Sequence, residues 1–300
     1  MTEPFVDTET DKTKSKWIAE TLRDFGRPKT TVRALFYYAL KRGVSDYPIC
    51  GKFVGEIRIC RPYAESDGER LQKWVSKAIK LGFIQPNAIL DEPPGELISL
   101  PKMPSSDIAK PRMEVWLNRS ALHQMILPAC KKHGATLVSV NGLPSDDAIK
   151  GLYQRCNAPT IILCLSDMSI NGISFCRALA DMIAKADTSG EYDIRARRIG
   201  LTPKQVLDQK IPMVQGERGT KESRRRYERY LKPYELNGRR MAELDALEAY
   251  YPGGLSGFVE EVLIRYGGSI SLEDEAWLLD LENGVLLAEE GIDSAEIDAQ

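Results

Sequence analysis

The segment TIILCLSDMSINGISF, residues 160–175, decides the fold of this chain. Its first six residues form an unbroken apolar run, which is typical of a strand buried on both faces of a parallel sheet. The run ends at Ser166 and Asp167, and Gly172 opens a predicted helix. Because ligands and metals bind outside the carboxyl ends of the strands in open α/β sheets, we expect Asp167 to lie at a functional edge.

Short apolar runs alternate with amphipathic segments on both sides of this stretch. The pattern predicts strands at residues 113–117, 136–140, 160–165 and 192–199, and helices at residues 120–133, 145–156 and 173–185. This alternation predicts a parallel sheet with right-handed crossovers. Residues 91–112 hold five prolines and are typical of a linker, with one short strand at residues 97–100.

The N-terminal part predicts a helical unit. Residues 1–13 should be disordered, and a helix should run from Lys14 to about Gly26. Thr30 or Thr31 should cap a second helix that ends near Arg42, and a third should begin after residue 66 or 67. With an extended segment at residues 83–90, this order resembles a winged helix-turn-helix.

Basic side chains recur at helical spacing on three of the predicted helices. Such rows suit contacts with nucleic-acid phosphates, and aromatic residues beside them suit stacking on bases or sugars. Ordinary solvated helix surfaces are the alternative explanation. The rows are Arg33, Tyr37 and Lys41; Arg70, Lys73, Lys77 and Lys80; and Lys221, Arg225 and Arg229 with Tyr227 and Tyr230 nearby.

Composition limits the class of protein. The 300 residues are 43% hydrophobic, which allows two compact units with cores of their own. The apolar runs are too short to cross a bilayer and the N-terminus lacks signal-peptide features, so we expect an intracellular, cytoplasmic or nucleoid-associated protein without a membrane partner.

The six cysteines form no CxxC pair and fit reduced thiols in the core of the protein. No P-loop is present, so we expect no nucleotide cofactor.

Charge is unevenly distributed along the chain. Residues 1–265 carry 41 basic and 33 acidic residues, a net charge of +8, whereas residues 266–300 carry ten acidic and no basic residues. A basic body favours a polyanionic partner. The acidic tail either contacts a partner, folds back over the basic surface, or is a solvated helix without a regulatory role.

The segment TVRALFYYALKRG, residues 31–43, resembles the helix that bears the active tyrosine in the A subunit of topoisomerase VI and its meiotic double-strand-break relatives. In that family an Arg-x-(Ile/Leu)-(Phe/Tyr)-Tyr pattern ends in the nucleophile, and Arg33 and Tyr37 occupy its two ends. The second half resembles a Toprim domain, and the mini-A proteins of mobile elements are nearest in size. Further matches are Glu114-Val115-Trp116, Ala121-Leu122, Gly142-x-Pro144-Ser145, Asp167 with Gly172, Leu201-Thr202-Pro203 and Glu243-Leu244-Asp245-Ala246-Leu247.

The resemblance implies a domain plan. It consists of a disordered tail at 1–13, a winged-helix DNA-binding domain at 14–92, a linker at 93–112, a Toprim-like domain at 113–250 and a helical acidic C-terminal extension at 251–300. The expected fold class is α/β plus α. The implied partners are DNA, a second copy of the chain in a homodimer, and a separate ATPase or other subunit.

The resemblance also implies a chemistry. The Tyr37 hydroxyl would attack a DNA backbone phosphate, while Toprim carboxylates of a second subunit hold magnesium. Tyrosine titrates near pH ~10, and Arg33 is the cation we assign to activate it. The metal ligands are altered: alignment places Asn118 and Ser169 where the family has Glu and Asp, which leaves only Asp167 and should weaken magnesium binding. Glu114, Asp146 or Asp147 would compensate in another register.

Two hypotheses follow. The first is a DNA-cleaving enzyme of the topoisomerase VI A type with Tyr37 as nucleophile. The second is a catalytically inactive dimeric DNA-binding or assembly subunit that has lost the metal ligands. The retained tyrosine helix favours the first, and the missing carboxylates favour the second.

Overall fold

The computed structural model describes residues 8–267 except 44–51, 55–56, 60, 62, 102–110, 157 and 188–191. It is a mixed α/β structure with a mostly parallel sheet, which confirms the coarse fold class expected from the sequence. None of the helices within these ranges is both long enough and apolar enough to cross a bilayer. The acidic tail from residue 268 onward, including most of the predicted C-terminal extension, lies outside the described residues.

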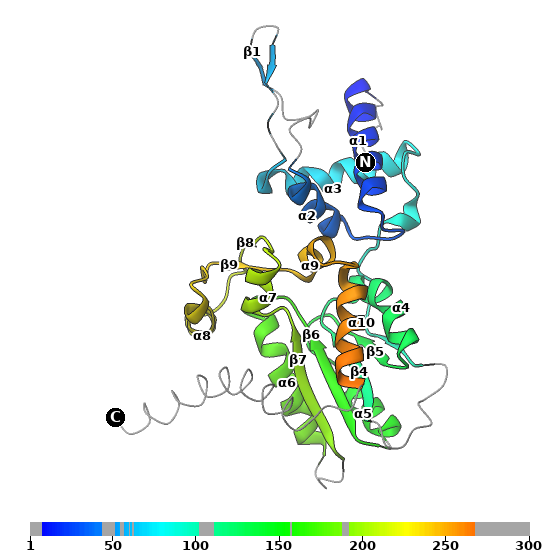
Figure 1. The fold of residues 1–300 in the computed structure, drawn as a ribbon, viewed down its shortest axis with the longest axis vertical. Helices are drawn as coiled ribbons and strands as arrows, with labels where there is room; N and C mark the ends of the chain where they lie inside the picture. The colour runs from blue at the N-terminus through cyan, green and yellow to red at the C-terminus, as the bar shows by residue number, and fades with distance from the viewer. Residues whose placement is uncertain are drawn as a thin grey trace, which may run out of the picture.

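The front unit contains three helices and a short hairpin (Figure 1). They are α1 (Glu9–Phe25), α2 (Val32–Arg42), β1 (Lys52–Val54), β2 (Ile57–Ile59) and α3 (Gly68–Lys80). Thr31 caps α2 as expected, since its hydroxyl accepts a hydrogen bond of 2.9 Å from the Ala34 amide. Apolar and aromatic side chains from all three helices form the core, including Ile18, Leu35, Phe36, Leu71 and Trp74.

The second unit is built on a five-stranded sheet in the order β3–β5–β4–β6–β7. Strands β4, β5, β6 and β7 are parallel, and β3 pairs antiparallel with β5 at one edge. The predicted alternation is therefore confirmed. The elements are β3 (Leu97–Ser99), β4 (Arg112–Leu117), α4 (His123–Lys132), β5 (Thr136–Ser139), α5 (Asp146–Arg155), β6 (Thr160–Leu165), α6 (Gly172–Ala186) and β7 (Ile194–Gly200).

The chain then leaves the sheet and returns to the front unit. It forms α7 (Pro203–Asp208), β8 (Val214–Gln215), α8 (Lys221–Leu231), β9 (Arg240–Met241), α9 (Leu244–Tyr250) and α10 (Gly254–Gly267), with 3₁₀ turns η1 (Glu65–Asp67), η2 (Pro86–Ala88), η3 (Ser120–Leu122) and η4 (Lys232–Tyr234). Helix α9 lies between the front unit and the sheet (Figure 1) and packs on α2. Helix α10 packs on α4 and α9, so residues 254–267 belong to the body of the molecule.

Two predictions about the front half are wrong. Helix α1 begins at Glu9 instead of Lys14, because the Thr8 hydroxyl accepts a hydrogen bond of 3.1 Å from the Asp11 amide. Residues 8–13, predicted to be disordered, therefore belong to the capped helix, and residues 1–7 lie outside the described residues. Residues 83–90 form a bend, η2 and a single bridge between Thr30 and Ile89 rather than an extended segment. The short strand expected at residues 97–100 is confirmed as β3, which pairs with β5 at the edge of the sheet.

Candidate functional site

Tyr37 lies where α2 packs against α9. Its side chain is fully buried, and its hydroxyl donates a hydrogen bond of 2.7 Å to Glu243 Oε2. One helical turn earlier, Arg33 forms an ion pair with the same carboxylate, and its Nη2 lies 3.4 Å from the Tyr37 hydroxyl. The predicted pairing of Arg33 with Tyr37 is present, but the predicted position of Tyr37 on an exposed polar face is wrong.

The surroundings of Tyr37 keep its hydroxyl protonated at neutral pH. Burial raises the pKa of Tyr37 well above its ordinary value, and the neighbouring Glu243 carboxylate raises it further. The Arg33 guanidinium lowers the pKa of the same hydroxyl but does not offset both effects. In this arrangement the Arg33 guanidinium does not bring the pKa of the Tyr37 hydroxyl below its ordinary value, and the activating role assigned to Arg33 stays a prediction.

Asp167 lies directly after β6, at the carboxyl edge of the sheet where the sequence predicted it. Its Oδ2 accepts a hydrogen bond of 3.2 Å from Arg119 Nη1, and its Oδ1 accepts one of 2.8 Å from the Leu244 amide. Burial raises the pKa of Asp167 to about 6, although Arg119 and the Leu244 amide act in the opposite direction. Both oxygens of this carboxylate are thus engaged inside the protein.

Arg119 connects Asp167 to a second buried carboxylate. Its Nη2 lies 3.1 Å from Asp245 Oδ2, and the other oxygen of Asp245 accepts a hydrogen bond from the Thr31 hydroxyl. Because Glu243 and Asp245 sit at the start of α9, this helix links Tyr37 to the end of β6. We call this network the junction: Thr31, Arg33, Tyr37, Arg119, Asp167, Glu243 and Asp245.

The junction forms within a single chain. Tyr37 and Asp167 belong to one hydrogen-bonded network through α9, whereas the resemblance implied that tyrosine and metal ligands meet across two subunits. Glu243 and Asp245 belong to the motifs that match the family, whereas Arg119 belongs to none of them. The signal in the sequence for Arg119 is its place directly after Asn118, at the end of a predicted strand.

The donor atoms around Asp167 do not suit a magnesium ion. Ser169 accepts a hydrogen bond of 3.0 Å from the Gly172 amide, and the buried Asn118 Oδ1 is an uncharged oxygen without a hydrogen-bond partner among the described residues. Magnesium needs near-octahedral oxygen ligands with carboxylate charge, and the charge of Asp167 already faces Arg119. Within the described residues, no group of three or more His, Cys, Asp or Glu is arranged to hold a metal.

The carboxylates proposed as compensating ligands lie elsewhere. Glu114 is buried in β4 and accepts hydrogen bonds of 2.6 and 2.9 Å from Arg155 and one of 2.9 Å from Trp116. Asp146 and Asp147 occupy the exposed first turn of α5. Glu114 stabilises the opposite end of the sheet instead of completing a site with Asp167.

Two close approaches fix the turn that carries Asp167. A Cβ added to Gly172 would lie 2.0 Å from the Asp167 carbonyl oxygen, so only glycine allows the chain to reverse here without a shift. Met168 and Ala242 exchange backbone hydrogen bonds of 2.8 and 3.1 Å, which brings the segment before α9 alongside the turn. The turn and the start of α9 are therefore positioned together.

Helix α8 is anchored to the same turn. The buried Tyr227 hydroxyl lies 2.8 Å from the Met168 carbonyl oxygen and 3.0 Å from that of Arg240. The predicted stacking role of Tyr227 is therefore wrong, because its ring is covered. The predicted cations Lys221, Arg225 and Arg229 are exposed on α8.

The predicted basic residues of the front unit have mixed positions. Lys41 donates a hydrogen bond of 3.0 Å to the Ala249 carbonyl, so it ties α2 to α9.

On α3, Lys77 forms an ion pair with Asp11 of α1, and Arg70 lies 3.8 Å from Asp67. Lys73 and Lys80 are exposed on α3. The row on α3 is real as a surface feature, but part of its charge is neutralised locally.

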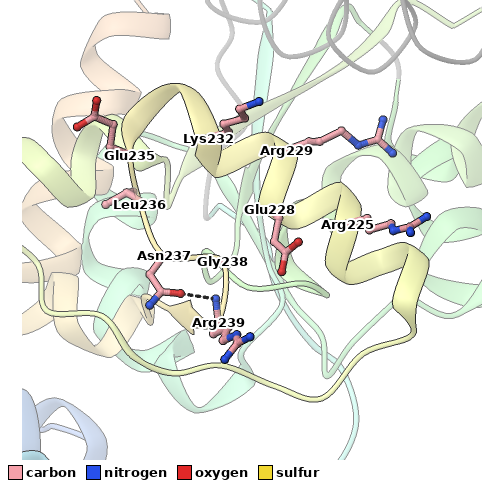
Figure 2. Close-up of a pocket in the computed structure, with 9 residues that line it drawn as sticks. All are labelled: Arg225, Glu228, Arg229, Lys232, Glu235, Leu236, Asn237, Gly238 and Arg239. Atoms are coloured by element: carbon pink, nitrogen blue, oxygen red, sulfur yellow. Dashed lines mark hydrogen bonds between the residues drawn. The ribbon is translucent and has the colours of Figure 1, made fainter.

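An open hollow of about 930 Å³ lies beside α8 (Figure 2). It adds Lys232 and Arg239 to the predicted cations. Lys232 follows Arg225 by seven residues, a helical spacing that is visible in the sequence, whereas Arg239 carries no such signal. The lining residues are Arg225, Glu228, Arg229, Lys232, Glu235, Leu236, Asn237, Gly238 and Arg239.

No protein-family model matches the chain, and a search of curated proteins finds no match either. Neither comparison bears on the resemblance to topoisomerase VI A subunits, which rests only on the residues quoted from the sequence.

Proposed function

We propose that the protein is a DNA-binding subunit of the topoisomerase VI A type in which the ancestral tyrosine and metal positions serve as a structural junction. The observation that carries this proposal is the state of Tyr37. Its hydroxyl is buried, donates to Glu243 and has a raised pKa. A nucleophile that must reach a DNA phosphate needs access, and the fully buried Tyr37 hydroxyl has none in this arrangement. Its raised pKa further disfavours the deprotonated form that would attack.

Exposed positive charge supports the DNA-binding half of the proposal. Arg225, Arg229, Lys232 and Arg239 are exposed, and none of them forms an ion pair or side-chain hydrogen bond within the described part of the chain. Cations that are not neutralised by neighbouring carboxylates are available to phosphates and release counterions on binding. With a net charge of +8 over residues 1–265, the body favours a polyanion.

DNA cleavage is the second candidate, and one observation favours it. Tyr37 has a guanidinium group beside its hydroxyl, and the network continues from its carboxylate partner to Asp167. Cleavage would require α2 to separate from α9, which would expose Tyr37 and remove the effect of Glu243 on its pKa. It would also require a metal bound with ligands other than the present set around Asp167.

A paired experiment separates the two functions. Fluorescence anisotropy with a labelled duplex measures binding at several salt concentrations, and detergent trapping with supercoiled plasmid and Mg²⁺ or Mn²⁺ detects covalent adducts. We expect binding that weakens as salt rises, and no adduct. An adduct that forms with the wild type and disappears in Tyr37→Phe establishes cleavage, whereas absence of duplex binding at low salt refutes DNA binding.

A further inference from the structure

We propose that one face of α8 and η4 binds successive phosphates along a strand of duplex DNA. The site consists of Arg225, Arg229 and Lys232, which we call the α8 row. This inference rests on the proposed DNA-binding function and names the surface and the chemical group that carry it. It predicts contact with the sugar-phosphate backbone, without base readout.

The spacing of the α8 row matches a backbone. Lys232 keeps helical backbone angles (φ −54°, ψ −44°), so the row continues regularly from α8 into η4. At a rise of about 1.5 Å per residue, its three Cα positions span about 10 Å along the helix axis. One DNA strand places a phosphate about every 3.4 Å of axial rise, so a row that lies along the duplex axis spans about three nucleotides.

The row is exposed and has no ion-pair partner within the part of the chain that the structure describes. Figure 2 shows that Arg225 and Arg229 extend to one side of α8, while Glu228 points to the other side, over the turn that contains Gly238 and Arg239. By contrast, Arg226 lies 3.8 Å from Glu222 on the same helix. Within the described residues the members of the row have no ion-pair partner, so their charge is open to a phosphate group there.

The turn beneath the row is held close to α8. A Cβ at Gly238 would lie 2.4 Å from Glu228 Cγ, so glycine allows the turn to pack directly on the helix. The Arg239 amide donates a hydrogen bond of 2.9 Å to Asn237 Oδ1, which fixes the turn locally (Figure 2). The Tyr227 anchor fixes the helix from its buried side. Both elements that line the hollow are thus set in place before a ligand arrives, which lowers the entropy lost on binding.

The test compares two full-length variants that lose the same charge. The first replaces Arg225, Arg229 and Lys232 by Gln. The control replaces Lys131, Lys185 and Lys204 by Gln, which are exposed cations on α4, α6 and α7. Binding to a labelled 20-base-pair duplex is measured by anisotropy from about 50 to 200 mM salt, the range in which counterion release changes affinity strongly. Circular dichroism confirms that both variants fold.

We expect the α8 variant to bind about 10- to 100-fold more weakly, and the slope of log affinity against log salt to become shallower by about 2 to 3, since each lost duplex phosphate contact removes about 0.9. The control should stay within about threefold of the wild type. Equal effects of the two variants overturn the α8 row as the site. Failure of the wild type to bind at all refutes the proposed function instead.

A second arm distinguishes the backbone from strand ends. The same duplex is used with 5′-phosphate and with 5′-hydroxyl ends, and a closed circular plasmid serves as competitor. Backbone contact predicts equal affinity for both ends and efficient competition by the circle. A loss of affinity in the α8 variant that is seen only with phosphorylated ends identifies a terminal-phosphate site and overturns the backbone assignment.

Discussion

The junction and the α8 row are built from the same kinds of side chain and treat charge in opposite ways. In the junction, Arg119 lies within 3.2 Å of two buried carboxylates, which neutralise its charge inside the protein. On α8, three cations project from an exposed helix without a carboxylate partner among the described residues. Buried charges require partners, whereas exposed ones do not, and only the second arrangement leaves charge for a ligand.

The comparison teaches that motif identity and site availability are separate questions. Arg33 and Tyr37 match the tyrosine motif, yet the Tyr37 hydroxyl is buried and hydrogen-bonded to Glu243. The α8 row matches no catalytic motif, yet it faces solvent. We therefore expect substitutions in the junction to change the stability of the protein, and substitutions in the row to change its binding. The predictions below test this division.

The largest effect should come from Arg119→Ala. Removal of the guanidinium leaves Asp167 and Asp245 buried without their main counter-charge, and breaking a buried pair in this way costs about 3–5 kcal/mol. Urea unfolding measures the loss. Arg226→Ala is the matched control, because its pair with Glu222 is exposed and should be worth less than about 1 kcal/mol. Equal losses in both variants would contradict the difference between the two regions.

Tyr37→Phe should have an intermediate effect. The variant keeps the packed ring but removes the hydroxyl that donates to Glu243, which should lower the free energy of unfolding by about 1–2 kcal/mol. Affinity for duplex DNA should not change. Tyr38→Phe is the control, because the neighbouring hydroxyl makes no hydrogen bond with another described residue. A binding defect in Tyr37→Phe without a stability defect would place Tyr37 at the DNA surface.

Asp167→Asn should have a smaller effect than the two substitutions above, and it should weaken the dependence of stability on pH. Burial raises the pKa of Asp167 to about 6 from an ordinary value of 3.8, so the folded state binds this proton more tightly than the unfolded state. The stabilisation from that proton is complete below about pH 4 and is lost as pH rises through about 6. Melting temperatures at pH 5 and pH 7 should therefore differ less in the variant than in the wild type. An unchanged difference would show that Asp167 does not titrate in this range.

Sequence patterns predicted most of the sheet unit because its signals are local. The apolar run at β6 and the Ser145 and Thr31 caps fixed element limits within one or two residues. The burial of Tyr37 was not predictable in the same way. Its helical spacing with Arg33 and Lys41 indicated a polar face, but that face is covered by α9, which lies more than 200 residues later in the chain. Long-range packing of this kind leaves no local periodicity to read.

The smallest effect should come from Glu228→Gln, and it tests how local the α8 row is. Glu228 lines the same hollow and its carboxylate opposes a phosphate held by Arg225 or Arg229, so its removal should strengthen duplex binding about two- to threefold. Glu222→Gln removes the same charge six residues earlier on the helix and should also free Arg226 from its pair. If the phosphates follow the row, Glu228→Gln has the larger effect on affinity. If both variants gain the same affinity for duplex DNA, binding responds to the total charge of α8. The α8 row would then differ from the junction only in being exposed to solvent.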